Sequence, residues 1–197
     1  MVDQAAVEVA EQSIWQLIGS GLRLMWWVWL LPVALIVILW SHDATVLDYL
    51  HVLSGGSWTG IDLFLGFLIG PVMRRLAPEA RRNFISLLIP RTLILLPVLS
   101  AVAITSGFYL AKSLGVLSQN AFHPWLIAAG LVVLWLFVQG FGVLLPTNLR
   151  VYREINRPQP DMAKVGRMMR RYIMITALQG VLQLAIIFIM ANLAFTR

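Results

Sequence analysis

The sequence predicts an all-α integral membrane bundle of about five transmembrane helices, and three observations support this fold class. Of the 197 residues, 59% are hydrophobic and only 12% are charged. A soluble domain carries about 25% charged residues. The apolar runs are long enough to cross a bilayer, which takes about 20 residues. The length then suits one compact transmembrane domain over residues 22–197, preceded by a short segment at residues 1–21.

The position of each expected element follows from the apolar and polar runs. Residues 1–21 mix acidic with apolar side chains, which predicts an amphipathic helix on the membrane surface or against a partner. A helix tolerates proline in its first turn, so Pro124 is expected to open the fourth span, and Pro146 to mark its end. The expected spans are residues 22–40, 45–73, 84–111, 124–145 and 172–193.

Lysine and arginine are concentrated in two of the segments between the spans, residues 74–82 and 150–171. Such segments stay on the cytoplasmic side of a membrane, so the sequence predicts an N-terminus inside and a C-terminus outside. The net charge of +6 is explained by the same attraction to anionic lipid, and nucleic acid is not an expected partner. The chain has no cysteine, which excludes disulfides, thiolate metal sites, iron–sulfur clusters and covalent c-type haem.

The second span carries ionisable residues, which are costly inside a bilayer and mark functional positions by default. One helical face of this span combines a histidine, glycines, a tryptophan and an acid: His51, Gly55, Trp58, Asp62, Gly66 and Gly70. An imidazole beside a glycine suits haem, because histidine binds the iron and small residues let the flat macrocycle lie against the helix. Two alternatives stay open. In the first, His51 is a packed histidine that is hydrogen-bonded to a neighbouring helix. In the second, the glycines serve to let a neighbouring helix approach closely.

A second axial or metal ligand must come from the same side of the membrane as His51. His123, at the start of the fourth span, is expected at a similar depth, whereas His42 lies in the first turn between spans. Met190, near the outer end of the fifth span, is a further candidate, although a membrane methionine more often serves packing. His51 and His123 are therefore the candidate metal ligands.

Asp62 and Arg91 are expected at matching depths in two consecutive antiparallel spans. A buried ion pair would relieve the cost of both charges, and this structural pair is the leading interpretation. The alternatives are a proton relay, or an arginine that holds a haem propionate. Arg91 is for this reason counted among the candidate cofactor-binding residues.

The segment from Tyr49 to Gly60, YLHVLSGGSWTG, resembles the helix with the pattern LH, six residues, W-x-G of the CopD-like membrane proteins. That superfamily includes copper-resistance CopD proteins, HemJ-type protoporphyrinogen oxidases and the membrane domain of PuuD-type urate oxidases. The match is strongest over residues 51–75, and the five-span layout with its basic segments extends it over most of the chain. The resemblance implies that His51 binds haem b or a metal and that Trp58 packs beside the ligand.

Three functions remain open at this point. The preferred hypothesis is a haem b-binding protein of the bacterial inner (plasma) membrane that acts as an electron-transfer or redox subunit, with other membrane or periplasmic redox subunits as partners. The alternatives are copper transport or resistance of the CopD type, and a non-catalytic structural subunit of a larger complex. A homo-oligomer is compatible with all three. The sequence contains no nucleotide-binding loop, catalytic triad or HExxH helix, so a hydrolase or ATPase is not expected, and enzymatic activity stays an open question.

Overall fold

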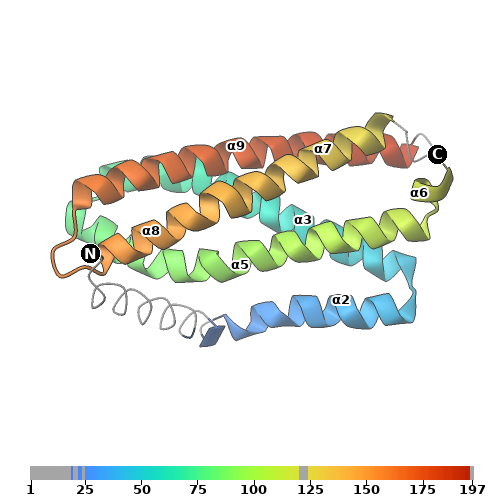
Figure 1. Ribbon diagram of the computed structural model, residues 1–197, viewed down its shortest axis with the longest axis horizontal. Helices are drawn as coiled ribbons and strands as arrows, with labels where there is room; N and C mark the ends of the chain where they lie inside the picture. Colours follow the sequence, from blue (N-terminus) through green and yellow to red (C-terminus); the bar gives the residue numbers. More distant parts are fainter. Residues whose placement is uncertain (1–18, 20–21, 24, 120–123, 196–197) are drawn as a thin grey trace, which may run out of the picture.

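The computed structural model describes residues 19, 22–23, 25–119 and 124–195, and these form an all-α bundle. In this part of the chain, four helices are long and apolar enough to span a membrane: Ala44–Arg75, Pro78–Ser113, Pro124–Ile155 and Met162–Leu193. A shorter apolar helix, Trp26–Ser41, precedes them. Figure 1 shows the helices running along one long axis, with this shorter helix on the outside of the bundle. The predicted fold class, an all-α membrane bundle of about five helices, is confirmed.

The first apolar helix leads into a tight turn. It opens as one 3₁₀ turn, η1 (Trp26–Trp29), and continues as α2 (Leu30–Ser41). His42 ends α2 in the left-handed conformation with φ 55°. Asp43 then caps the next helix, because its Oδ1 accepts hydrogen bonds from the amides of Thr45 at 2.8 Å and Val46 at 3.2 Å. The predicted amphipathic segment at residues 1–21 lies outside the described residues apart from Gly19.

Two of the long helices contain a π-helical segment in front of a proline. The helix 44–75 consists of α3 (Ala44–Leu63), η2 (Phe64–Ile69) and α4 (Gly70–Arg75). The helix 124–155 consists of α7 (Pro124–Gln139), η3 (Gly140–Leu144) and α8 (Leu145–Ile155).

The sequence predicts that the fourth span ends at Pro146, but the helix continues past this residue. The π segments explain why. Proline lacks an amide hydrogen, and its ring clashes with the carbonyl four residues earlier. The amide of Leu145, directly before Pro146, donates to the carbonyl of Gly140, five residues back. The wider turn relieves the clash, so the helix continues to Ile155. Gly70 and Pro71 repeat the arrangement in the second span, where the Gly70 amide donates to Leu65.

The two basic segments are mostly helical rather than loops, which corrects the predicted boundaries. Helix α5 (Pro78–Ser113) begins directly after a two-residue connection, and α9 (Met162–Phe195) begins ten residues before the predicted fifth span. Figure 1 shows the α4–α5 and α8–α9 connections at one end of the bundle, called the basic end below, and the α2–α3 turn at the other. The positive-inside rule predicts that the basic end faces the cytoplasm.

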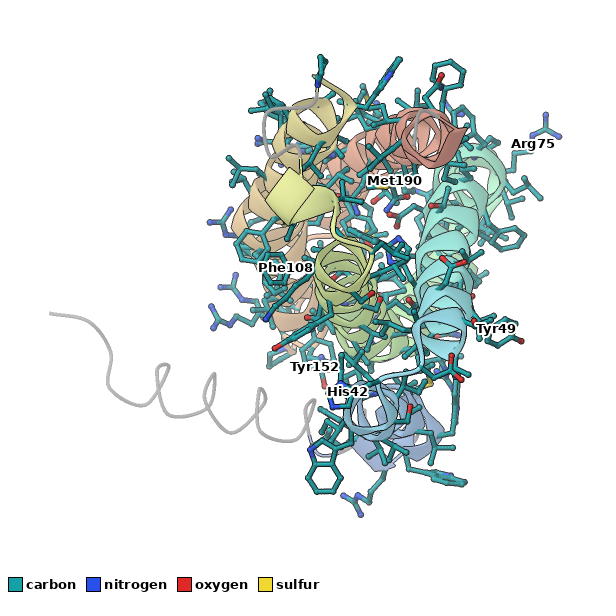
Figure 2. All side chains as sticks on the ribbon, turned by 90° about the vertical axis from the view of Figure 1, so that its right-hand side faces the viewer. His42, Tyr49, Arg75, Phe108, Tyr152 and Met190 are labelled. Carbon is teal, nitrogen blue, oxygen red and sulfur yellow. The ribbon has the colours of Figure 1, made fainter. Side chains whose placement is uncertain are left out.

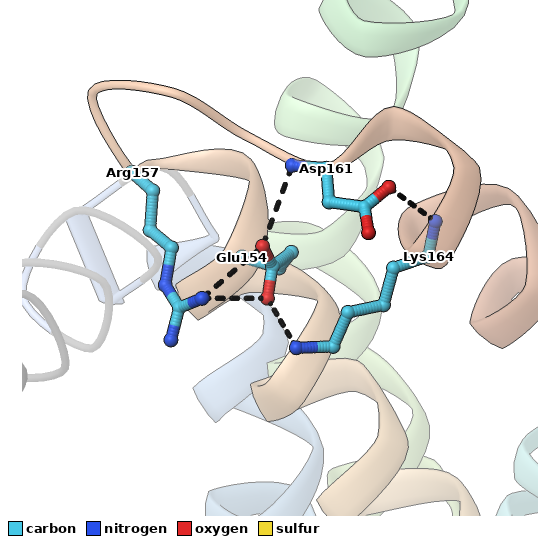
Figure 3. Close-up of polar contacts among 4 residues, drawn as sticks. All are labelled: Glu154, Arg157, Asp161 and Lys164. Atoms are coloured by element: carbon cyan, nitrogen blue, oxygen red, sulfur yellow. Dashed lines mark hydrogen bonds and ion pairs between the residues drawn. The ribbon is translucent and has the colours of Figure 1, made fainter.

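Glu154 closes the connection between α8 and α9 at the basic end (Figure 3). Its side chain is buried, and Oε2 lies 2.7 Å from Lys164 Nζ and 3.2 Å from the Arg157 guanidinium. The Asp161 amide donates to Oε1 at 3.4 Å. One carboxylate therefore satisfies three donors from the connection and from the first turn of α9, which fixes the angle between the two helices.

Many of the largest apolar side chains point outward, as a lipid environment requires. Figure 2 shows Tyr49 and Phe108 directed away from the bundle, and their side chains are 68% and 59% exposed. Along α2 the outward residues Val33, Ile36 and Trp40 continue the same apolar surface. A soluble monomer rarely exposes a contiguous apolar surface of this extent. The outer surface therefore matches the hydrocarbon interior of a bilayer.

Glycines on the second span let α9 approach closely. A Cβ added at Gly66 would lie 2.6 Å from both the Cα and the Cβ of Ala177, and one at Gly70 would lie 2.6 Å from the Ile173 side chain. Gly180 on α9 makes the reciprocal contact with Leu63, at 2.8 Å from Cδ2. The interpretation of Gly66 and Gly70 as close-approach residues is confirmed.

Candidate functional site

His51 lies on α3, and its half-buried imidazole faces α5. Nδ1 is 2.9 Å from the carbonyl oxygen of Ala103 and 3.3 Å from Ser106 Oγ. A carbonyl can only accept, so Nδ1 carries the hydrogen and donates it, which leaves the lone pair on Nε2. Within the described residues Nε2 has no hydrogen-bond partner. The contact with α5 thus fixes the tautomer and leaves one nitrogen able to bind a ligand.

Gly107 provides the surface on which the imidazole rests. A Cβ at this position would lie 2.7 Å from His51 Cε1 and 3.1 Å from Nδ1, so no larger residue fits without moving the ring. The Ser106 hydroxyl donates to the carbonyls of Val102 at 2.6 Å and Ala103 at 3.1 Å, and is itself buried. One turn of α5 therefore determines both the position and the orientation of His51.

Gly55 and Trp58, the other predicted cofactor residues of this face, contact protein. A Cβ at Gly55 would lie 3.9 Å from the Ala103 side chain, an ordinary contact, so α5 covers this glycine. Trp58 is buried in an apolar cluster with Leu96 and Leu99 of α5. A flat macrocycle bound to His51 would therefore lie on the Nε2 side of the imidazole and not against Gly55. The nitrogen of His51 that can bind a metal is therefore Nε2.

The candidates for a second ligand differ in their placement. His123 lies outside the described residues. His42 is exposed at the end of α2. Met190 is half-buried, and Figure 2 shows it on the side of α9 that faces α3, near the end of the bundle opposite the basic end. Met190 is five residues from the end of α9 and His51 seven from the start of α3, so the two differ in depth by about 3 Å.

The predicted ion pair between Asp62 and Arg91 is wrong. Arg91 is half-exposed and donates to the carbonyl of Leu87 on its own helix. Asp62 is 0% exposed and its Oδ2 accepts a hydrogen bond from Gln179 Nε2 on α9 at 2.8 Å. The helices α3 and α5 are neighbours, as expected, but matching depth does not fix which way a side chain points around its helix.

Asp62 belongs to a buried polar group that the ion-pair prediction had missed. Gln183 and Trp58 face the same carboxylate as Gln179. On α9, four buried polar residues follow at helical spacing and form a surface named the α9 polar face: Tyr172, Thr176, Gln179 and Gln183. Each of the four has at least one polar side-chain atom without a hydrogen-bond partner among the described residues, as does Asp62 through Oδ1.

A small, partly open cavity of about 40 Å³ adjoins this group. Trp58 and Gln179, which contact Asp62, line it together with Tyr172 and Asn148. The Asn148 Oδ1 and the Tyr172 hydroxyl are also buried without a partner in the described part of the chain. Buried polar atoms of this kind are rare in native proteins, and a cluster of them beside a cavity indicates a site for water or for a polar ligand.

The sequence did contain a signal for the α9 polar face. Residues 172, 176, 179 and 183 are spaced by four, three and four, which places their side chains on one side of a helix. In a transmembrane helix such a polar stripe faces the bundle interior. The contacts of His51 with Ala103 and Gly107 had no comparable signal, because a backbone carbonyl and a glycine leave no distinctive pattern in the sequence.

These features define the class of the protein, a multi-pass α-helical membrane protein. It has a histidine whose orientation is fixed by a hydrogen bond toward one end of the bundle, and a buried carboxylate deeper inside. No protein-family model, no curated protein and no solved structure matches this chain. The resemblance to the CopD-like proteins therefore depends on the residues around His51 and Trp58 and on the five-span layout with its basic segments.

Proposed function

We propose that this protein binds haem b through Nε2 of His51 and acts as an electron-transfer or redox subunit in the bacterial inner membrane. The observation that carries the proposal is the hydrogen bond between His51 Nδ1 and the Ala103 carbonyl. Metal-binding histidines usually donate their other ring N–H in this way, which sets the tautomer and makes the ligating nitrogen more basic. The likeness of residues 49–60 to the CopD-like helix supports the same assignment.

The second axial position would be filled by Met190 or His123. Met190 comes from the helix that packs beside α3 and lies at a similar depth. The haem supplies one-electron chemistry when bound, and the protein orients it, excludes water and tunes its potential through the ligands and the surrounding charge. A membrane or periplasmic redox protein would exchange electrons with it near the end of the bundle opposite the basic end.

The optical spectrum of the purified protein tests this proposal. Expressed with adequate haem, the full chain is expected to show a Soret band and, after dithionite reduction, the α and β bands of haem b. His51→Ala is expected to lose them, whereas Asp48→Asn, an exposed change on the same helix, should keep them. Bound copper without haem would indicate the CopD-type alternative. A protein with neither, and unchanged assembly of His51→Ala, would indicate a structural subunit; both results overturn the haem proposal.

A further inference from the structure

Asp62 is a buried carboxylate that has no positively charged partner in the described part of the chain. The described residues contain two ion pairs, both of them with Glu154 at the basic end. Arg91 on α5 is directed to the Leu87 carbonyl instead. The titratable group that faces Asp62 from α9 is the Tyr172 phenol. Among the described residues no positive charge offsets an ionised carboxylate at this position.

The surroundings of Asp62 can nevertheless stabilise both of its protonation states. Gln179 Nε2 donates to Oδ2 at 2.8 Å, and Gln183 and Trp58 face the same group, so donors are present for the charged form. The unpaired Oδ1 can carry the proton of the neutral form, and the nearby amide oxygens of Gln179 and Gln183 can accept a hydrogen bond from it. A carboxyl group with partners for both states can gain and lose a proton.

The α9 polar face offers a route by which that proton can move. Tyr172 and Gln183 are eleven residues apart, which is about 16 Å along a helix. The hydroxyls of Thr176 and Tyr172 each donate and accept, and both are buried without a partner among the described residues. The hydroxyl of Tyr172 lies close to Asn148 and Thr92, which connects α9 with α8 and α5.

The cavity lined by Trp58 and Gln179, the two residues that contact Asp62, has room for water. A water molecule needs about 10–15 Å³ of such space, so the cavity of about 40 Å³ can hold roughly three or four molecules. Its lining is mostly apolar but includes the polar side chains of Gln179, Tyr172 and Asn148, which supply the two to four partners that such a water requires.

We propose that Asp62 is a proton-binding site inside the membrane, which exchanges its proton through water held along the α9 polar face. In the elementary step a hydronium ion transfers a proton to the carboxylate, which leaves a water molecule and a neutral carboxylic acid; no electron moves. The reverse step returns the proton to a water in the cavity. The site is independent of haem, because Asp62 is eleven residues from His51 and shares no hydrogen bond with it.

Infrared difference spectroscopy of the full chain in lipid, recorded as the pH is changed, tests this proposal. The wild-type protein is expected to show the carbonyl stretch of a protonated carboxylic acid, which disappears as the pH rises and shifts when water is replaced by D₂O. Labelling the carboxyl carbon of aspartate with ¹³C should shift the band, whereas labelled glutamate should not. This labelling needs no variant. The other described aspartates are exposed: Asp43, Asp48 and Asp161. Asp62 is therefore the buried aspartate to which the band is expected to belong.

Variants then assign the band to one residue. Asp62→Asn is expected to remove it, Asp48→Asn to leave it unchanged, and Asp62→Glu to restore a titrating band at a different frequency. A wild-type protein without the band, or with a band that neither titrates nor responds to D₂O, would overturn the proposal. Loss of the band on adding sodium at constant pH, with no response to choline, would replace the proton with a metal cation and would also overturn it.

Discussion

Replacing Gly66 by alanine is expected to destabilise the protein by about 1–3 kcal/mol. The added methyl carbon would lie 2.6 Å from the Cα and Cβ of Ala177 and 2.9 Å from its amide nitrogen. These are backbone atoms and the first side-chain carbon, which cannot rotate out of the way, so α9 must move away from the second span. For a chain of this length each kcal/mol corresponds to roughly 2–4 °C, and thermal unfolding in detergent measures the difference.

Gly60 provides the matched control for this change, because it lies on the same continuous helix and nothing would contact an added Cβ within 4 Å. Gly60→Ala should leave the unfolding temperature unchanged or raise it, since alanine favours a helix over glycine by about 0.5–1 kcal/mol. If Gly66→Ala proves as stable as Gly60→Ala, the close approach of α9 to the second span is not correct.

Gly107→Ala is expected to lower haem affinity about 10- to 100-fold, the range found when a partner that orients a metal ligand is lost. The new Cβ would lie 2.7 Å from His51 Cε1, so the imidazole must turn away and lose its bond to the Ala103 carbonyl. His51 itself remains in the chain. The variant therefore separates the orientation of the ligand from its presence, and haem titration followed by the Soret band measures the effect.

Gly55→Ala is the control that also decides on which side the macrocycle lies. Its Cβ would lie 3.9 Å from the Ala103 side chain, which is ordinary packing, so haem affinity should stay unchanged. A loss at Gly55 together with an unaffected Gly107→Ala would place the macrocycle against Gly55, as the sequence alone suggested. That result would contradict the orientation of His51 that its contacts with α5 impose.

The fold could be predicted well from the sequence because a bilayer constrains a helix by length and polarity. Four spans and a shorter apolar helix lie where hydropathy predicts them. Their ends differ from the prediction at Pro146 and in the basic segments. Pro146 misled the prediction because local propensity indicates a break, whereas a π segment at residues 140–144 absorbs the missing hydrogen bond. The arginines at 74–82 and 150–171 lie mostly within helices at the basic end. The charge pattern therefore predicts which end of the bundle is basic, but it does not predict the residue at which each helix ends.

The site could be predicted only in part, since a sequence gives the depth of a side chain more readily than its direction. His51 and Asp62 could be identified from the sequence because ionisable residues are rare inside a span. Arg91 was paired with Asp62 on depth alone, but the carboxylate points to Gln179 of a helix more than a hundred residues later in the chain. Such a long-range contact is fixed by how the helices pack together.

Replacement of His51 by glycine, followed by addition of free imidazole, tests the central claim most directly. The His51→Gly protein is expected to lack the haem b spectrum, because the ligand to the iron is removed. Imidazole added at millimolar concentration should enter the space left by the side chain and restore the Soret band and the reduced α band. A variant that keeps the wild-type spectrum without imidazole would contradict the assignment of His51 as the axial ligand.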